Sequence, residues 1–380
     1  MTMFAFPEIA VPPGGEALRQ EVRAFLKDHV SQDARLAGIG SFGDHDPEFS
    51  RALGARGWIG LTWPKEYGGG ERSPLERLIV NEELIAAGAP VGAHWGAGRQ
   101  SAPSILHLGT EEQRRTFVPR IAAGECFFGT GMSEPDSGSD LASIRTFARQ
   151  VDGGFVVNGS KIWTSDAHRV HYIILFCRTA ERSDNRHAGF SQFIVDMRNP
   201  AIEIRPIINL AGEHHFNQIF FDEAFIPESA LLGKLNEGWG QVMAELAFER
   251  SGPERFLSSY TLIRLFVDHL GSNPSPQAAQ LVGKLVAQLM VLRRMCYSVV
   301  GHGGAHAALR ASVVKDLGAT FEQDVPELIR NLVDIEPDPS SDNPFTVALA
   351  RTLLYAPSFS IRGGTREILR GIIARAMGVR

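Results

Sequence analysis

Cysteine is scarce in this sequence, and long apolar runs are absent. The three cysteines (Cys126, Cys177 and Cys296) lack the spacing of a metal site, so we expect buried free thiols in a reducing compartment. No apolar run reaches the ~18 residues of a membrane-spanning helix. No Lys or Arg precedes Arg19, so we do not expect a secretory signal. These absences predict a cytoplasmic protein with no membrane partner.

An excess of positive charge is also missing. The 380 residues include 38 Lys and Arg against 43 Asp and Glu, which gives a net charge of −5, and no basic block stands out. This composition argues against a nucleic-acid partner. Hydrophobic residues make up 44% of the chain, which is enough for a large core and for two or three packed regions.

The predicted elements change in type twice along the chain. Residues 1–125 show helical spacing of apolar residues, with Pro74 at a first helical position and Thr110 as an N-cap. Short β-type runs then alternate with turns, and an Asp152-Gly153 turn joins two of them. The rest of the chain is again helical. We therefore predict an α+β fold with a helical N-terminal domain (1–125), a middle β-domain (126–232) and a C-terminal helical bundle (233–380).

Two segments of the predicted β-domain are rich in Gly, Ser and Thr: FFGTGMSEPDSGSD (127–140) and GSKIWTSDAH (159–168). The glycines of the first segment let backbone N–H groups approach a ligand closely. In the second segment, Trp163 and Ser165 share one face of a predicted strand. Each residue alone is equally compatible with a core or turn role. Together, a flat ring and a hydroxyl on one face favour the binding of a planar heterocycle with polar edges.

The runs SEPDSGSD and KIWTSDAH resemble those that surround FAD in the acyl-CoA dehydrogenases, and the resemblance covers nearly the whole chain. It implies a helical N-terminal domain, a β-barrel-like middle domain and a C-terminal four-helix bundle. The implied reaction removes the α-proton of an acyl-CoA thioester and passes the β-hydride to flavin, with electron-transfer flavoprotein as the electron acceptor. The FAD contacts implied by the resemblance are Met132, Ser133, Gly138, Ser139, Trp163, Ser165, Thr365 and Glu367.

The resemblance also indicates a catalytic base. Many members carry it as the Glu of a Y-E-G-T run near the C-terminus, but the matching residue here is Gly363, which cannot take a proton. Other members place a Glu before an Arg on a helix of the C-terminal bundle, where this chain reads ALAFERSGPERF. This match implies Glu249 as the base and Arg250 as a substrate-binding residue, and Pro253 predicts a kink that opens this turn toward the ligand. The alternative for Glu249 is an ordinary solvated carboxylate. The competing carboxylates are Glu245 and Glu254.

Two parts of the family pattern are missing. In homo-oligomeric members, an Arg before Phe-Gly and a Gln-x-x-Gly-Gly run reach the FAD of a neighbouring subunit. Here Arg264 is the only candidate in the first region, and ALARTLLYAPSFS occupies the second. The chain therefore forms either a homotetramer with altered contacts or a heterotetramer with a paralogous chain, as in some enzymes of steroid side-chain degradation. Gly363 removes bulk near the substrate, which favours a branched, long or ring-bearing acyl group.

Two other functions remain open for the same residues. One is different flavin chemistry on this fold (oxidase, monooxygenase or desulfinase), which oxygen reactivity would separate from dehydrogenation. The other is a non-catalytic partner subunit, which would bind little flavin alone and would tolerate Glu249→Gln. No metal is expected, because the candidate histidines lack further clustered ligands. These histidines are His214, His215, His302 and His306.

Overall fold

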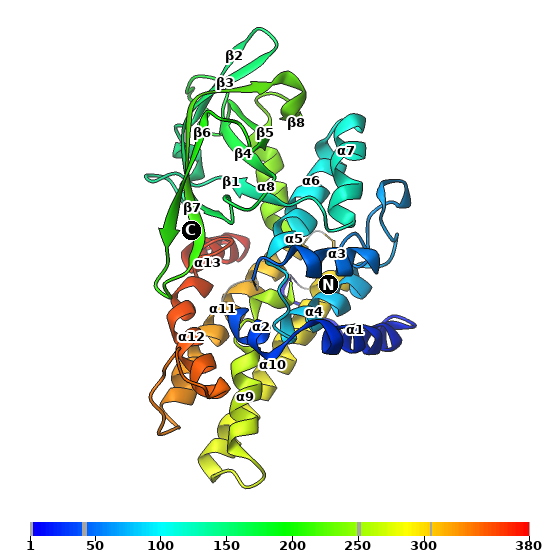
Figure 1. The fold of residues 1–380 in the computed structure, drawn as a ribbon, viewed down its shortest axis with the longest axis vertical. Helices are drawn as coiled ribbons and strands as arrows, with labels where there is room; N and C mark the ends of the chain where they lie inside the picture. The colour runs from blue at the N-terminus through cyan, green and yellow to red at the C-terminus, as the bar shows by residue number, and fades with distance from the viewer. Residues whose placement is uncertain (1–2, 40–43, 249–251, 305, 380) are drawn as a thin grey trace. The chain divides into compact units, whose positions relative to one another are not determined.

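The computed structural model describes residues 3–39, 44–248, 252–304 and 306–379, of which 244–248 are described by their backbone alone (Figure 1). The chain divides into two compact units. Unit 1 comprises Met1–Asp44, Arg72–Gly92 and Ala247–Arg380, and unit 2 comprises His45–Glu71 and Ala93–Leu246. Each unit is therefore assembled from segments that are distant in the sequence.

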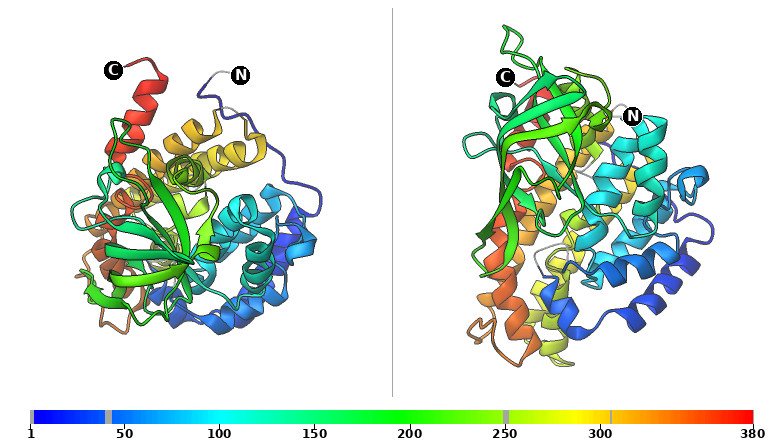
Figure 2. Two further views of the ribbon diagram at one scale, coloured as in Figure 1. Left: turned by 90° about the horizontal axis from the view of Figure 1, so that it is seen from above. Right: turned by 45° about the horizontal axis from the view of Figure 1, so that its top comes forward.

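Unit 2 contains an eight-stranded mixed sheet. Its order is β6-β7-β3-β2-β4-β5-β8, and β1 pairs in parallel with β4. The strands twist strongly in both views of Figure 2. The predicted Asp152-Gly153 turn is confirmed, because β2 and β3 pair in an antiparallel hairpin that closes at Val151 and Gly154. The bounds are β1 (Phe128–Gly131), β2 (Phe147–Val151), β3 (Gly154–Ser165), β4 (Tyr172–Arg178), β5 (Phe190–Asp196), β6 (Ile202–Ile208), β7 (His214–Pro227) and β8 (Leu231–Leu232).

Strands β4 and β5 are buried on both faces. Ile173 and Phe193 belong to the main core of the sheet. Phe176 and Phe190 point to the opposite face and pack against Val242 of helix α8 (Gly238–Phe248). Burial on both sides explains why these strands read as continuous apolar runs rather than as alternating ones.

Short helices complete unit 2. The predicted N-cap at Thr110 is confirmed: its hydroxyl accepts a hydrogen bond from Gln113 N at 3.2 Å, and Gln113 Oε1 accepts one from Thr110 N at 3.1 Å. This capping box fixes the start of α7. The helices are α3 (Pro47–Ala55), α5 (Gly92–Gly96), α6 (Ala102–Leu108) and α7 (Glu111–Ala122), with a π-helical turn over Ala97–Ser101 between α5 and α6.

Unit 1 is helical. Its elements are α1 (Gly15–His29), α2 (Gln32–Ala37), α4 (Pro74–Ala86), the 3₁₀ turn η5 (Pro253–Arg255), α9 (Tyr260–Leu270), α10 (Pro276–His302), α11 (Ala307–Arg330), α12 (Pro344–Phe359) and α13 (Arg366–Ala376). Helices α9, α10, α11 and α12 pack against one another (Figure 1). Pro74 begins α4 directly after the capping residue Ser73, as predicted. The predicted α+β fold class is confirmed.

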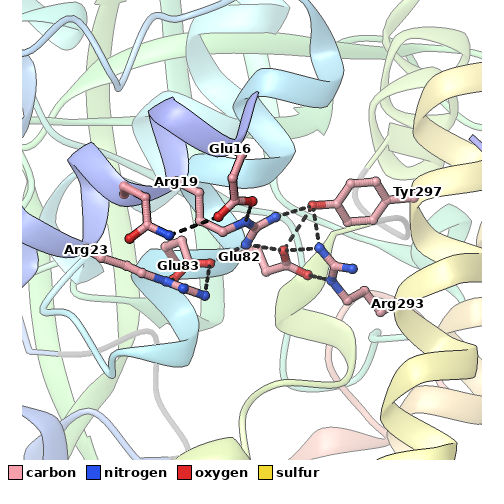
Figure 3. Close-up of polar contacts among 8 residues, drawn as sticks. Glu16, Arg19, Arg23, Glu82, Glu83, Arg293 and Tyr297 are labelled. Carbon is pink, nitrogen blue, oxygen red and sulfur yellow. Dashed lines mark hydrogen bonds and ion pairs between the residues drawn. The ribbon is translucent and has the colours of Figure 1, made fainter. Parts of the chain in front are cut away.

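A buried cluster of charges joins three helices of unit 1 (Figure 3). Glu82 of α4 accepts hydrogen bonds from Arg19 of α1 at 2.9 Å, from Arg293 of α10 at 2.6 Å and from the Tyr297 hydroxyl at 2.9 Å. Arg19 also donates to Glu83 and, at 3.0 Å, to the Tyr297 oxygen. Burial and the neighbouring Glu82 raise the pKa of Tyr297 to about 12. The cluster therefore ties α1, α4 and α10 together through side chains. We call it the α1–α4–α10 cluster.

Two further properties limit what the fold can do. Among the helices of the part of the chain that the structure describes, none combines the length and the hydropathy needed to cross a membrane. Within the same residues, no group of three or more His, Cys, Asp or Glu side chains is arranged to hold a metal ion. Instead, the His214 Nε2–H group donates to Asn217 Oδ1 at 2.7 Å, and the ring stacks on His168 at a centroid distance of 3.8 Å.

Candidate functional site

The two Gly- and Ser-rich segments of unit 2 are hydrogen-bonded to each other. The backbone N–H of Ile162 in β3 donates to the Ser133 carbonyl at 2.9 Å. The Lys161 ammonium donates to the Met132 carbonyl at 3.0 Å. The loop that follows β1 is therefore held along the end of β3. Met132 and Ser133, both half-buried, are brought next to the strand that carries Trp163.

Trp163 lies in a β-bulge at the end of β3. Lys161 pairs with Ile219 and Thr164 with Asn217, so two residues of β3 oppose a single residue of β7. The backbone of Trp163 is left-handed (φ 60°), which is unusual for a bulky residue and marks a locally strained conformation. The residue as a whole is 56% exposed. A large aromatic side chain that the fold presents to the outside at a strained position is typical of a binding site.

Ser165 lies on the exposed side of the strand with Trp163. Thr164 between them is buried, and Ser165 is exposed. The indole and the Phe216 ring of β7 form a T-shaped pair, with ring centroids 5.8 Å apart and planes at 87°. Trp163 and Ser165 are therefore both exposed at this end of β3, on either side of a buried threonine.

A buried ion pair lies beneath this loop. The Lys161 Nζ and Glu134 Oε1 atoms are 2.8 Å apart, and both side chains are buried. The Glu134 carboxylate also accepts hydrogen bonds from the backbone N–H groups of Arg145 at 2.6 Å and Thr146 at 2.9 Å. Burial works to raise the pKa of Glu134, but the charge and hydrogen bond of Lys161, with those two N–H groups, hold it below its usual value. Glu134 is therefore ionised at neutral pH.

The remainder of the first segment, residues 134–140, forms a turn that is held by hydrogen bonds among its own residues and is partly exposed to solvent. Glu134 and Ser137 exchange backbone hydrogen bonds of 2.8 and 2.9 Å, and the Ser137 hydroxyl donates to the Asp140 carbonyl at 2.5 Å. Gly138 and Ser139 are exposed, and a Cβ placed on Gly138 would meet no atom within 4 Å. Their backbone N–H groups are therefore accessible to a ligand. An open backbone turn and an exposed indole are features that suit the phosphate and ring portions of a flavin dinucleotide.

The remaining described site residues belong to unit 1. Thr365 caps α13 by accepting a hydrogen bond from Ile368 N at 3.4 Å, and it is half-buried. Glu367 is exposed in the first turn of α13, and its pKa lies below the usual value because its own backbone N–H and the Thr365 side chain hydrogen-bond to it. The start of α13 therefore presents a hydroxyl and a carboxylate.

Gly363, which precedes this helix, has a left-handed backbone (φ 65°). A Cβ at this position would lie 3.1 Å from Arg255 Nη2. The neighbouring Gly364 carbonyl accepts a hydrogen bond from Lys315 Nζ at 2.5 Å, which fixes the turn. Glycine is favoured here for two reasons. A residue with a side chain would be strained in this left-handed backbone conformation, and its Cβ would crowd the buried Arg255 guanidinium.

The residues expected to perform the chemistry, Glu249 and Arg250, lie outside the described residues, as does the kink expected around them. The described part of helix α8 runs to Phe248, and the description resumes at Gly252, directly before the 3₁₀ turn Pro253–Arg255. Of the competing carboxylates, Glu254 is buried and lies 3.1 Å from Arg255 Nε. The side chain of Glu245 is not described.

Several buried polar residues of unit 2 had no recognised sequence signal. Glu134 and Lys161 each fall inside a recognised segment, but nothing in the sequence indicates that they pair. His94 of α5 is fully buried, and burial lowers its pKa to about 3. Its Nδ1 lies 2.8 Å from the Ser50 hydroxyl of α3. Helices α5 and α6 were not predicted either, because the Gly-rich stretch GAHWGAGRQ obscures helical periodicity.

Known proteins resemble this chain over its whole length. The family description "Acyl-CoA dehydrogenase, N-terminal domain" matches residues 13–125, and "Acyl-CoA dehydrogenase, middle domain" matches residues 129–224. Acyl-CoA dehydrogenase IpdE1 of Mycobacterium tuberculosis (strain ATCC 25618 / H37Rv) is 30% identical over 377 residues, which cover 96% of this chain and 97% of that protein. Acyl-CoA dehydrogenase FadE34 of the same organism is 33% identical over 336 residues, 87% of this chain and 46% of that protein.

Solved structures agree with this relationship. The "Tcur3481-Tcur3483 steroid ACAD" is 28% identical with a TM-score of 0.86, covering 97% of this chain and 98% of that one. The ChsE4-ChsE5 complex from Mycobacterium tuberculosis is 28% identical with a TM-score of 0.85, covering 98% of this chain and 100% of that one. The fold and the paired segments define an oxidoreductase of a class whose members are flavoproteins. The chain belongs to the acyl-CoA dehydrogenase family. It is accordingly an enzyme of the acyl-CoA dehydrogenase type.

Proposed function

We propose that this chain catalyses the FAD-dependent α,β-dehydrogenation of an acyl-CoA thioester to the 2-enoyl-CoA. The observation that carries the proposal is the hydrogen-bonded junction of the two segments, where Ile162 N meets the Ser133 carbonyl at 2.9 Å. Beside this junction, Trp163 is held in a strained, exposed conformation with Ser165 on the same side. This local geometry supports a preformed surface for a planar ring.

The cofactor FAD accepts the substrate's β-hydride when it is bound. The open backbone at Gly138 and Ser139 would bind its pyrophosphate, and Met132 and Ser133 would contact its ring edge. Trp163 would pack on the ring, and the Ser165 hydroxyl would hydrogen-bond to its reactive edge. Thr365 and Glu367, at the start of α13, would contact FAD in the way that the family resemblance implies. Each role is one that the accessibility of the residue allows.

Glu249 would take the α-proton of the thioester, and Arg250 would contact the substrate. Support comes from two positions that are unsuited to the task. Gly363 has no proton-accepting group, and its left-handed backbone and contact distance to Arg255 disfavour any side chain there. Glu254 is buried against Arg255. A carboxylate engaged in this way is a poor general base, because its charged form is already stabilised by the guanidinium.

The test is anaerobic reduction of the bound flavin by an acyl-CoA, followed as loss of visible absorbance. Glu249→Gln should abolish bleaching while leaving FAD bound, and Glu245→Gln, four residues earlier in the sequence, is the matched control that should bleach normally. Bleaching by Glu249→Gln at the wild-type rate would overturn the assignment of the base. Rapid reaction of the reduced wild-type enzyme with oxygen would instead favour oxidase or monooxygenase chemistry.

The acyl group and the oligomer belong to the same proposal. We also propose a bulky acyl group, because Gly363 replaces the Glu that many family members carry at this position, and a clear preference for butyryl-CoA in a panel of thioesters would overturn this part of the proposal. The missing subunit-sharing motifs, and the paired names of two similar structures, support a heterotetramer with a paralogous chain over a homotetramer. We also propose electron-transfer flavoprotein as the electron acceptor and the cytoplasm as the location of the protein. We further propose three domains, with boundaries at residues 125 and 232.

Native mass and FAD content of the purified chain separate the oligomeric alternatives. One FAD per chain in a tetramer would support a self-sufficient homotetramer. A flavin-poor dimer or monomer that gains FAD on co-expression with a paralogue would support the heteromer.

A further inference from the structure

We propose that the Glu134–Lys161 ion pair is a positioning device for the cofactor site, so that it sets the affinity for FAD and not only the stability of unit 2. The inference rests on the proposed FAD-dependent function. Neither side chain is accessible to a ligand, since both are buried. The pair acts through the backbone and strand that it holds.

The bonds of the pair go to main-chain atoms of two different segments. Lys161 donates to the Met132 carbonyl at 3.0 Å, on the loop that follows β1. Glu134 accepts from Arg145 N and Thr146 N at 2.6 and 2.9 Å, at the entry to β2. The pair thereby joins the loop, β2 and β3 at one point. A change in either side chain is transmitted directly to the path of the backbone.

The point of attachment lies next to the strained residue. Lys161 is the last residue of β3 in regular register before the bulge, and Trp163 follows two positions later with φ 60°. A left-handed conformation of a bulky residue persists only where the surrounding structure enforces it. The bonds of Lys161 to Met132 and of Ile162 to Ser133 hold both sides of the junction. We infer that releasing them lets the bulge relax and turns the indole away from its presented orientation.

The chemistry of the pair also argues for more than a structural role. A buried ion pair is expensive to desolvate, and well-packed apolar residues of similar volume often replace one with no loss of stability. An apolar pair, however, has no donor for the Met132 carbonyl and no acceptor for the two backbone N–H groups. These three main-chain bonds are what the ionic pair supplies and a hydrophobic one does not.

The test separates positioning from stability with two variants. Lys161→Met removes the donor and leaves a buried carboxylate without its ammonium partner, whereas the double variant Glu134→Gln/Lys161→Met removes the charge as well. We expect both to bind FAD at least about tenfold more weakly than wild type, since a hydrogen bond from a charged group is lost. The melting temperature of the apoprotein should fall more for Lys161→Met than for the double variant, because only the single variant leaves a buried carboxylate without a partner. The visible circular dichroism of bound FAD should change in both, because the surroundings of the ring change.

Ser50→Ala is the matched control in unit 2. It removes a buried hydroxyl that bonds His94 at 2.8 Å and the Asp46 carbonyl at 2.8 Å, so it should lower the melting temperature and leave the FAD dissociation constant unchanged. The inference is overturned if the Lys161 variants bind FAD as wild type does, with unchanged circular dichroism, while their stability falls. If the wild-type chain takes up no FAD, alone or with a paralogous partner, the proposed cofactor itself is wrong, and this inference with it.

Discussion

Each unit encloses a group of opposite charges, and the two groups differ in what they hold. In unit 2, Lys161 and Glu134 have side-chain exposures of 0% and 8%, and their further hydrogen bonds go to the main chain. In unit 1, Arg19 is also buried, but its partners are carboxylates and a phenol. The outer guanidinium groups of that cluster, Arg23 and Arg293, are 53% and 45% exposed (Figure 3).

This difference separates two uses of buried charge. Bonds from side chains to the main chain fix where a loop and a strand run, so they affect any ligand that the backbone contacts. Bonds between side chains of neighbouring helices link surfaces that are already packed, so they affect stability and little else. We therefore expect changes to the pair in unit 2 to alter both properties, and changes to the α1–α4–α10 cluster to alter stability alone.

The composition of the chain provides a probe that distinguishes the units. All five tryptophans (Trp58, Trp63, Trp95, Trp163 and Trp239) lie within unit 2. Intrinsic tryptophan fluorescence therefore follows unfolding of unit 2, whereas far-ultraviolet circular dichroism follows both units. A change confined to one unit shifts one signal more than the other.

The largest loss of stability is expected for Lys161→Met. The Glu134 carboxylate stays buried without its ammonium partner, and breaking a buried pair in this way costs about 3–5 kcal/mol. The urea midpoint measured by tryptophan fluorescence should fall accordingly. An unchanged midpoint would show that the Glu134 carboxylate gains water or a proton at little cost. The expectation that the ion pair in unit 2 affects stability would then be wrong.

A smaller loss is expected for Arg19→Met in unit 1. Glu82 keeps Arg293 and Tyr297 as partners, so neither the charge nor the hydrogen-bonding capacity of that carboxylate is left uncompensated. Losing the buried charged hydrogen bonds should cost about 1.5–3 kcal/mol. The midpoint by circular dichroism should fall, and the FAD dissociation constant should not change. Weaker FAD binding by this variant would contradict the distinction between the two groups of charges.

The pH dependence of unit 2 provides a third test. The folded-state pKa of His94 is lowered to about 3 by burial, while an unfolded His titrates near 6.5. As the pH falls below about 6.5, the unfolded state binds a proton that the native state does not, so stability is lost at about 1.4 kcal/mol per pH unit. The loss should continue until the folded pKa is reached. Stability at pH 7 already contains the full contribution of the neutral imidazole.

His94→Gln is the matched variant for this test, because an amide retains the ability to hydrogen-bond Ser50 and does not titrate. Urea midpoints from tryptophan fluorescence at pH 7.0 and 5.5 should differ less for His94→Gln than for wild type. Equal pH dependence of the two proteins would mean that His94 does not cause the acid sensitivity.

Local signals allowed much of the fold to be predicted from the sequence. A proline after Ser73, a threonine before α7 and the Asp152-Gly153 dipeptide each act within a few residues of chain, and the structure confirms all three. The family resemblance rests on two continuous runs, which are equally local. Caps and turns of this kind depend on the backbone preferences of single residues, so they can be predicted from the sequence without a structure.

The groups of charges were not predictable in the same way. Glu134 and Lys161 are 27 residues apart, and Glu82 and Arg293 are 211 residues apart. Their pairing depends on the path of the intervening chain, not on any local preference. The left-handed conformation of Trp163 was also missed, since Trp carries none of the turn signals of Gly, Asn or Asp. Strain of this kind follows from the tertiary structure that enforces it.

The smallest effect should come from the outer edge of the α1–α4–α10 cluster. Arg23 donates to Glu83 from Nε at 2.7 Å and from Nη2 at 3.2 Å, but its side chain is 53% exposed. Solvent screens this pair, so Arg23→Gln should cost at most about 1 kcal/mol, and less at high salt. Arg19→Met, buried in the same cluster, should lose the same stability at low and at high salt. If Arg23→Gln instead lost as much stability as Arg19→Met, and lost it equally at low and at high salt, then solvent exposure would not determine how much each residue of this cluster contributes to stability.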